Sequence, residues 1–143
     1  MKLTSIQNNK ASKSGMTLLE LTVVILVLLS LISILFIGAR AWKKGSDRAA
    51  SILQIRNAQQ AVRSYANMNG KNPGEADANI VTEVFGPGKF IETNPVGSPH
   101  PAGSSVSFEY GPAGMTFVPI VGHLFIEASD AEYMPTAGSF NAW

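Results

Sequence analysis

The longest apolar run in the sequence extends from Leu21 to Ala39 and contains no charged residue. As an α-helix, this run would be roughly 28 Å long, close to the thickness of about 30 Å of a bilayer's hydrocarbon core. The pattern therefore predicts a transmembrane helix. Glu20 directly precedes the run, and an ionisable group at the edge of a membrane helix is costly unless it has a partner. Glu20 is therefore a candidate functional residue.

Helical periodicity continues beyond Arg40 as an amphipathic pattern. Apolar residues recur at steps of three and four, as expected of a stripe that packs on a sheet: Ile52, Ile55, Ala58, Val62 and Tyr65. The polar residues lie mostly off this stripe: Arg48, Arg56, Gln59 and Arg63. With Gly70 as C-cap and Pro73 beyond it, we expect one helix from Met16 to Asn69. The alternative is two helices that are separated near Gly38 or Gly45.

Short strands are expected after the helix. Val106, Phe108 and Tyr110 alternate with polar residues, which is typical of a half-buried strand. Met115 to Val121 would form the second strand of a hairpin, and His123 to Ala128 a third strand. A short helix from Asp77 to Phe85, with Asp77 as its N-cap, would precede them. The fold class predicted is thus α+β, a long N-terminal helix packed on a small antiparallel sheet, and residues 129–143 show no periodicity.

Composition and motifs argue against several classes of function. The chain has 143 residues, no cysteine and a formal net charge of +1, so a disulfide, a thiolate metal site and a cysteine nucleophile are excluded. A basic nucleic-acid-binding face is not indicated. No phosphate-binding loop or serine-hydrolase motif occurs. His100 and His123 lack a second ligand at catalytic-metal spacing, and we expect each to be solvated or satisfied by a hydrogen bond. The sequence thus predicts no enzyme.

The residues before the apolar run carry a specific pattern. Residues 1–15 contain Lys2, Lys10 and Lys13 and no acid, and Gly15 precedes Met16-Thr17-Leu18-Leu19-Glu20. This arrangement resembles the prepilin leader of type IV pilins and of type II secretion pseudopilins. The resemblance implies that a prepilin peptidase cleaves between Gly15 and Met16 and methylates the new amine of Met16. It also implies four segments: a leader (1–15), a transmembrane and filament-core helix (16–41), an amphipathic continuation (42–74) and a pilin-like head (75–143).

The function implied by the resemblance is that of a structural filament subunit. Glu20 of one subunit would pair with the Met16 ammonium of its neighbour and set the axial register of assembly. The partners would be the prepilin peptidase, other copies of the chain, minor pilins, an inner-membrane platform protein with its assembly ATPase, and membrane lipid, with no nucleic acid. The chain would lie in a bacterial inner membrane with its N-terminus in the cytoplasm and its head in the periplasm. The missing cysteines favour a secretion pseudopilus over a type IV pilus.

An acidic cluster near the C-terminus could be either a calcium site or a solvated turn. Glu127, Asp130 and Glu132 are hard oxygen ligands near the C-terminus, and calcium is the cation that they would suit. Major pseudopilins, which this chain resembles, have a calcium site in their C-terminal loops, so the resemblance allows one here. The spacing matches no defined calcium loop, so a solvated acidic turn is the favoured interpretation and no other cofactor is expected.

Three alternatives to a filament subunit stay open. Ala39-Arg40-Ala41 fits a signal-peptidase pattern, so cleavage there would produce a mature chain that starts at Trp42. Basic residues also follow the apolar run, so charge bias alone does not orient the helix, and only the family resemblance does. The second alternative is a membrane-anchored binding or sensory domain that never polymerises. In this interpretation Glu20 is an interfacial residue that the helix dipole favours. A secreted enzyme is the third alternative.

Overall fold

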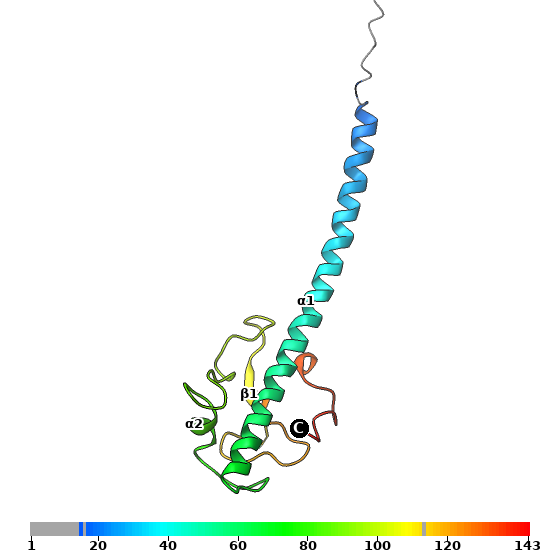
Figure 1. Ribbon diagram of the computed structural model, residues 1–143. Helices are drawn as coiled ribbons and strands as arrows, with labels where there is room; N and C mark the ends of the chain where they lie inside the picture. The colour runs from blue at the N-terminus through cyan, green and yellow to red at the C-terminus, as the bar shows by residue number, and fades with distance from the viewer. Residues whose placement is uncertain (1–14, 16, 113) are drawn as a thin grey trace, which may run out of the picture. The chain divides into compact units, whose positions relative to one another are not determined.

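The computed structural model describes Gly15, residues 17–112 and residues 114–143. Its elements in chain order are α1 (Leu18–Met68), α2 (Ile80–Val84), β1 (Phe108–Tyr110), β2 (Ile126–Ala128) and the 3-10 helix η1 (Ala131–Tyr133) (Figure 1). The described residues divide into two compact units between Ala39 and Arg40, and α1 contributes to both. We call residues 40–143 the head unit. Of the predicted leader, only Gly15 is among the described residues. Met16 lies outside them.

The amphipathic part of α1 supplies one wall of the core of the head unit. Ile55, Ala58, Val62 and Tyr65 are buried, as the periodicity predicts, and Ile52 is half-buried. The helix continues through Gly38 and Gly45, so the single helix that the sequence predicts is confirmed over the described residues and the alternative of two helices is not found there. Gly70 has a φ of +65°, and the N–H of Lys71 donates to the carbonyl of Ala66 at 2.8 Å. This glycine C-cap ends α1 where the sequence predicts it.

The sheet is smaller than predicted and joins different segments. β1 pairs with β2 in antiparallel register, with Phe108 opposite Ala128 and Tyr110 opposite Ile126. The predicted hairpin partner, Met115 to Val121, is not a strand. Of the predicted third strand, His123 to Ala128, only the last three residues form a strand, which is β2. A single long helix with a small antiparallel sheet confirms the α+β class.

Segment 115–121 is not a hairpin strand because its backbone bonds elsewhere. The N–H of Asp77 donates to the carbonyl of Thr116 at 2.7 Å, and the N–H of Gly74 donates to the carbonyl of Val118 at 2.8 Å. The N–H of Val118 donates in turn to the carbonyl of Glu75 at 3.0 Å. Pro119 has no N–H to add to a ladder. The segment therefore contacts the turn after α1, which is distant in sequence.

The described part of the head unit has one contiguous hydrophobic core. Phe125 lies at its centre, with its ring centroid 6.2 Å from that of Phe85 and 5.7 Å from that of Tyr110. α2 contributes Ile80 and Val84 and has Asn79 as its N-cap, so the predicted N-cap at Asp77 is wrong. The Asp77 carboxylate accepts the N–H of Asn79 instead.

Two polar residues of α1 are also part of this core, and the sequence pattern did not indicate them. Gln59 is 1% exposed and contacts the backbone before β2, so its predicted position off the buried stripe is wrong. Ser51 is fully buried and donates to the carbonyl of Tyr133 at 3.0 Å.

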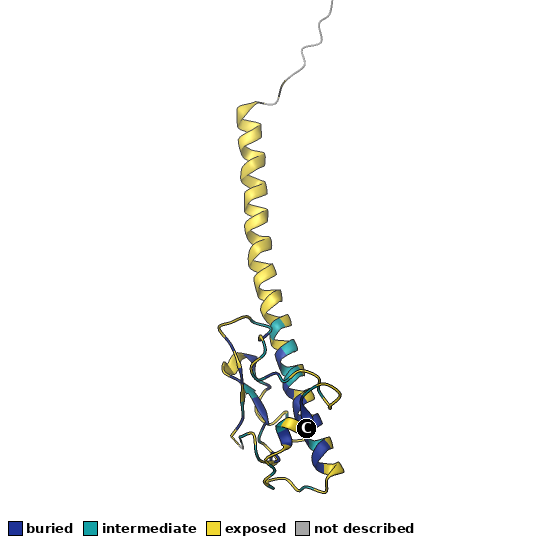
Figure 2. Cartoon of the chain, turned by 90° about the vertical axis from the view of Figure 1, so that its left-hand side faces the viewer, coloured by how far each residue is buried: buried dark blue, intermediate teal, exposed yellow. Residues whose placement is uncertain are grey.

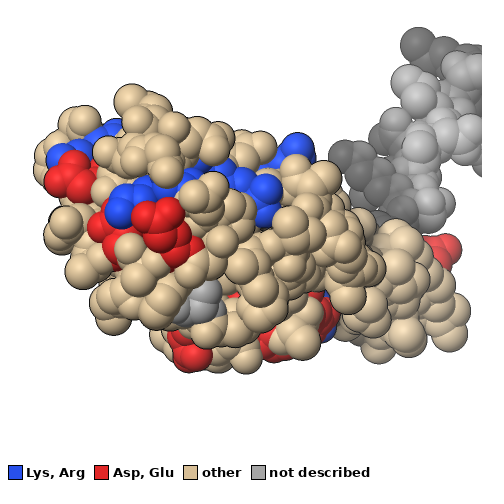
Figure 3. All heavy atoms as spheres, turned by 90° about the horizontal axis from the view of Figure 1, so that it is seen from below, with Lys and Arg blue, Asp and Glu red and all other residues tan. Residues whose placement is uncertain are grey.

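Acidic and basic side chains are interspersed on the face shown in Figure 3, and two surface ion pairs join Lys71 to Glu75 and Lys89 to Glu83.

Candidate membrane and processing site

α1 begins with a reciprocal hydrogen-bonded cap formed by Thr17 and Glu20. The N–H of Thr17 donates to Oε2 of Glu20 at 3.0 Å, and the N–H of Glu20 donates to Oγ1 of Thr17 at 3.3 Å. This is a capping box, in which two N–H groups at the start of a helix receive side-chain acceptors. The negative charge of Glu20 also lies at the positive end of the helix dipole. Glu20 therefore fixes where the apolar helix begins.

The capping box was missed in the sequence, although its signal was present. Thr17-Leu18-Leu19-Glu20 has the Thr-x-x-Glu spacing that precedes an apolar run. In the structure, the cap occupies one oxygen of the Glu20 carboxylate. Oε1 of Glu20 has no hydrogen-bond or ion-pair partner among the described residues.

The apolar part of α1 is exposed on all sides. Its large side chains are between 44% exposed at Val24 and 81% exposed at Leu18 (Figure 2). It is long and apolar enough to cross a membrane, and it lies near the N-terminus. A helix that is apolar all round is stable only when lipid or other protein covers it.

The three hydroxyl groups of this apolar part are satisfied within the helix. Thr22 donates to the carbonyl of Leu19, Ser30 to that of Val27, and Ser33 to that of Leu29, at 2.7–2.8 Å. Hydroxyls bonded to their own backbone do not need water. The helix thus presents no unsatisfied side-chain hydroxyl to a hydrocarbon environment.

Gly15 lies before the cap and is exposed. No described atom lies within 4 Å of the position that a Cβ at residue 15 would occupy, and its φ is outside the left-handed region. Neither space nor backbone conformation therefore requires glycine at this position. Met16, the predicted mature N-terminus, is outside the described residues.

The predicted acidic cluster is dispersed among separate contacts. Glu132 pairs with Lys44 at 2.7 Å, and Asp130 accepts the N–H of Glu132 at the start of η1. Glu127 lies on β2 opposite Glu109. Within the described ranges, no three His, Cys, Asp or Glu side chains gather closely enough to hold a metal ion. Calcium binding by Glu127, Asp130 and Glu132 stays a prediction.

His100 is satisfied in the core of the head unit. Its Nε2 lies 3.0 Å from Oγ of Ser51, and its Nδ1 accepts the N–H of Ala102 at 3.0 Å. Because the Ser51 hydroxyl donates to Tyr133, Nε2 carries the proton and the imidazole is neutral. Burial lowers the pKa of His100, while the Asp47 carboxylate acts weakly in the opposite direction. The side chain joins α1 to two loops and is not a free base.

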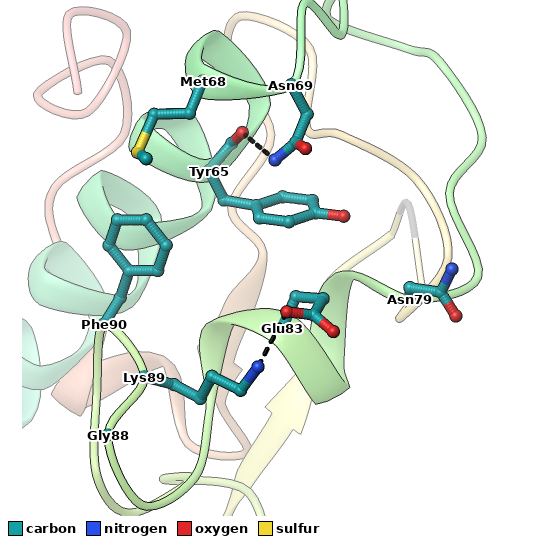
Figure 4. Close-up of a pocket in the computed structure, with 8 residues that line it drawn as sticks. All are labelled: Tyr65, Met68, Asn69, Asn79, Glu83, Gly88, Lys89 and Phe90. Atoms are coloured by element: carbon teal, nitrogen blue, oxygen red, sulfur yellow. Dashed lines mark hydrogen bonds and ion pairs between the residues drawn. The ribbon is translucent and has the colours of Figure 1, made fainter.

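A hollow of about 670 Å³ in the head unit lies beside the end of α1. Figure 4 shows Met68 and Phe90 on one side and the Glu83–Lys89 ion pair, at 2.8 Å, on another. Nearby, the Tyr65 hydroxyl donates to Asp77, and burial together with this contact raises the pKa of Tyr65. The lining contains no nucleophile hydrogen-bonded to a base, so among the described residues it offers no catalytic arrangement.

Three comparisons with known proteins found no relative of this chain. No protein-family model, curated protein or solved structure matches this chain. The functional interpretation therefore depends on the chain's own residues.

Proposed function

We propose that the chain is a structural subunit of a helical, membrane-derived filament, either a type II secretion pseudopilus or a type IV pilus. A prepilin peptidase would cleave it between Gly15 and Met16 and methylate Met16. The observation that carries the proposal is an exposed apolar helix whose first turn is capped by Thr17 and Glu20, shortly after a glycine that neither space nor backbone conformation requires. The subunit has a structural role and no catalytic residue.

The apolar part of α1 supports assembly because it requires a continuous cover. In the inner membrane, lipid covers it, and in a filament, the corresponding helices of other copies do. Transfer from one cover to the other exposes no apolar surface to water, so extraction costs little hydrophobic free energy. The platform protein and its ATPase would drive that transfer.

The geometry of Glu20 supports a directional contact between neighbouring subunits. Cleavage would leave an ammonium on Met16, adjacent to the Thr17 N–H that Oε2 of Glu20 accepts. Oε1 would then accept the Met16 ammonium of a neighbouring copy while the cap stays intact. In a helix bundle that excludes water, a broken charge pair is expensive, so this contact would select one register.

Glu20→Gln tests this pairing because glutamine retains the cap and removes the charge. We expect Glu20→Gln to insert in the membrane at wild-type level but to form at least tenfold fewer filaments in cells that carry the assembly machinery. Glu92→Gln, at an exposed position of the head unit, is the control and should assemble normally. Filaments of Glu20→Gln at wild-type number would contradict a role for the charge.

One observation favours a second candidate, a membrane-anchored binding domain that does not polymerise. The hollow beside Met68 and Phe90 combines apolar and charged lining, as ligand sites do. In this case, the wild-type chain would form no filaments even with the full machinery, and Glu20→Gln would have no effect.

A further inference from the structure

Three cations lie on one face of α1 immediately after the apolar run. Arg40, Lys44 and Arg48 are spaced at i, i+4 and i+8, which places them one above another on the helix surface. All three are exposed. Like charges at this spacing destabilise a helix by a few tenths of a kcal/mol per pair, so an anion bound among them would stabilise it.

The chain itself compensates these cations only in part. Residues 40–48 carry four cations and one acid, Asp47, which pairs with Lys43 at 2.7 Å. Lys44 pairs with Glu132, and both side chains are about half exposed, so water screens the contact. Within the part of the chain that the structure describes, no ion pair involves Arg40 or Arg48.

The position of these residues along the helix points to a headgroup layer. Arg40 to Lys44 lie roughly 2–8 Å beyond Ala39 along α1, and a headgroup layer is about 5–7 Å thick on each side of a bilayer. Helical side chains incline toward the N-terminus, here toward the bilayer. Trp42, 79% exposed, occupies the depth at which tryptophan is enriched at membrane interfaces.

We propose that Arg40, Lys43 and Lys44 form a binding site for the phosphate groups of anionic phospholipids, with Trp42 at the boundary of the hydrocarbon. Phosphatidylglycerol offers a phosphate without a cation, whereas the choline ammonium of phosphatidylcholine repels the same side chains. Arg48 lies beyond the headgroups and adds long-range attraction. The inference rests on the membrane-anchoring part of the proposed function and not on filament formation.

The test measures which lipid surrounds Trp42 in the full-length chain. Trp143→Phe leaves Trp42 as the sole tryptophan. The protein is reconstituted in vesicles of phosphatidylcholine with about 30 mol% phosphatidylglycerol, an anionic content typical of a charged membrane. In one set of vesicles the phosphatidylglycerol is brominated. In the other set the phosphatidylglycerol is unlabelled, and the same mole fraction of brominated phosphatidylcholine is present instead. Bromines quench tryptophan on contact, so the ratio of quenching reports local enrichment.

We expect brominated phosphatidylglycerol to quench Trp42 about twofold more than brominated phosphatidylcholine. Arg40→Gln/Lys43→Gln, which leaves the Lys44–Glu132 pair intact, should bring the ratio to about one. Lys71→Gln/Lys89→Gln removes the same charge from the head unit and should keep the wild-type ratio.

Three results would overturn the proposal. Equal quenching in the parent chain would mean that no anionic lipid gathers around Trp42. An unchanged ratio in Arg40→Gln/Lys43→Gln, or an equal fall in the control, would mean that these cations do not form the site. Absence of quenching in both vesicle sets would mean that the helix is not in the bilayer, and membrane anchoring would fail as well.

Discussion

Gln59 on α1 and Phe125 before β2 are joined by a buried hydrogen bond, in which the Gln59 side-chain oxygen accepts the Phe125 N–H at 2.8 Å. The same side chain donates through Nε2 to the carbonyl of His123 at 3.1 Å. One amide thus satisfies the N–H of Phe125 and the carbonyl of His123 on the irregular segment that precedes β2. This contact fixes the position of the segment that supplies Phe125 to the core.

Gln59→Leu should therefore destabilise the head unit although leucine has a similar volume. The Phe125 N–H would stay buried without an acceptor, and we expect a loss of about 2–3 kcal/mol in the free energy of unfolding. Gln60→Leu, at the exposed neighbouring position, should change it by less than about 0.5 kcal/mol. Urea unfolding of both variants in detergent measures the difference. Equal midpoints for the two variants would exclude a structural role for the Gln59 amide.

The second prediction concerns two glycines, one at which the structure leaves no room for a side chain and one at which it does. A Cβ on Gly111 would collide with the backbone carbonyl of Leu124, whereas a Cβ on Gly45 within α1 would meet open space. We expect Gly111→Ala to lower the free energy of unfolding by about 2 kcal/mol or more, since backbone must move. Gly45→Ala should raise helix stability by up to about 1 kcal/mol. The same unfolding assay tests both, and a tolerated Gly111→Ala would contradict the close approach.

The stability of the head unit should depend on pH through His100. Its pKa is lowered by burial from an ordinary value of 6.5, so the unfolded chain binds a proton more readily than the folded one. The free energy of unfolding should be maximal above about pH 6.5 and fall as the pH decreases through this region toward the folded-state pKa. Measurement between about pH 7.5 and pH 5.5 keeps most carboxylates ionised.

His100→Gln should remove most of this slope, at a lower overall stability. His123→Gln is the control because His123 is half-buried and does not share the Ser51 contact. A slope that persists in His100→Gln and disappears in His123→Gln would contradict the assignment.

The capping box supplies the fourth prediction. Thr17→Val removes the hydroxyl that accepts the Glu20 N–H and retains the shape of the side chain. We expect a local loss of about 1 kcal/mol, or roughly fivefold faster amide exchange in the first turn of α1. Thr22→Val, whose hydroxyl bonds only to the Leu19 carbonyl, should leave exchange in that turn unchanged. Similar exchange in the two variants would show that the cap does not hold the start of the helix.

Sequence patterns predicted the elements that depend on local periodicity. The apolar run, the buried stripe from Ile55 to Tyr65 and the glycine stop at Gly70 all follow from neighbours within one or two helical turns. β1 was expected because apolar and polar residues alternate around Phe108.

The rest depends on contacts between residues distant in sequence. Segment 115–121 has a strand-like composition, but its backbone bonds to the turn at residues 74–77. Gln59 and Ser51 look like surface positions until the loops that they bind are in place. The C-terminal segment has no periodicity, yet Tyr133 is buried and Trp143 lies under the Arg56 guanidinium at 5.5 Å. Of the candidate site, Glu20 was found from its charge, whereas the role of Thr17 was missed although the Thr-x-x-Glu spacing was present.

The intact mass and N-terminal sequence of the protein purified from its native membrane test the central claim most directly. We predict a chain that starts at Met16 and carries one extra methyl group on its amine. A start at Trp42 would mean cleavage after Ala39-Arg40-Ala41 and loss of the apolar helix, and a start at Met1 would mean an uncut anchor. Either of these two results would contradict prepilin processing and the filament subunit proposed from it.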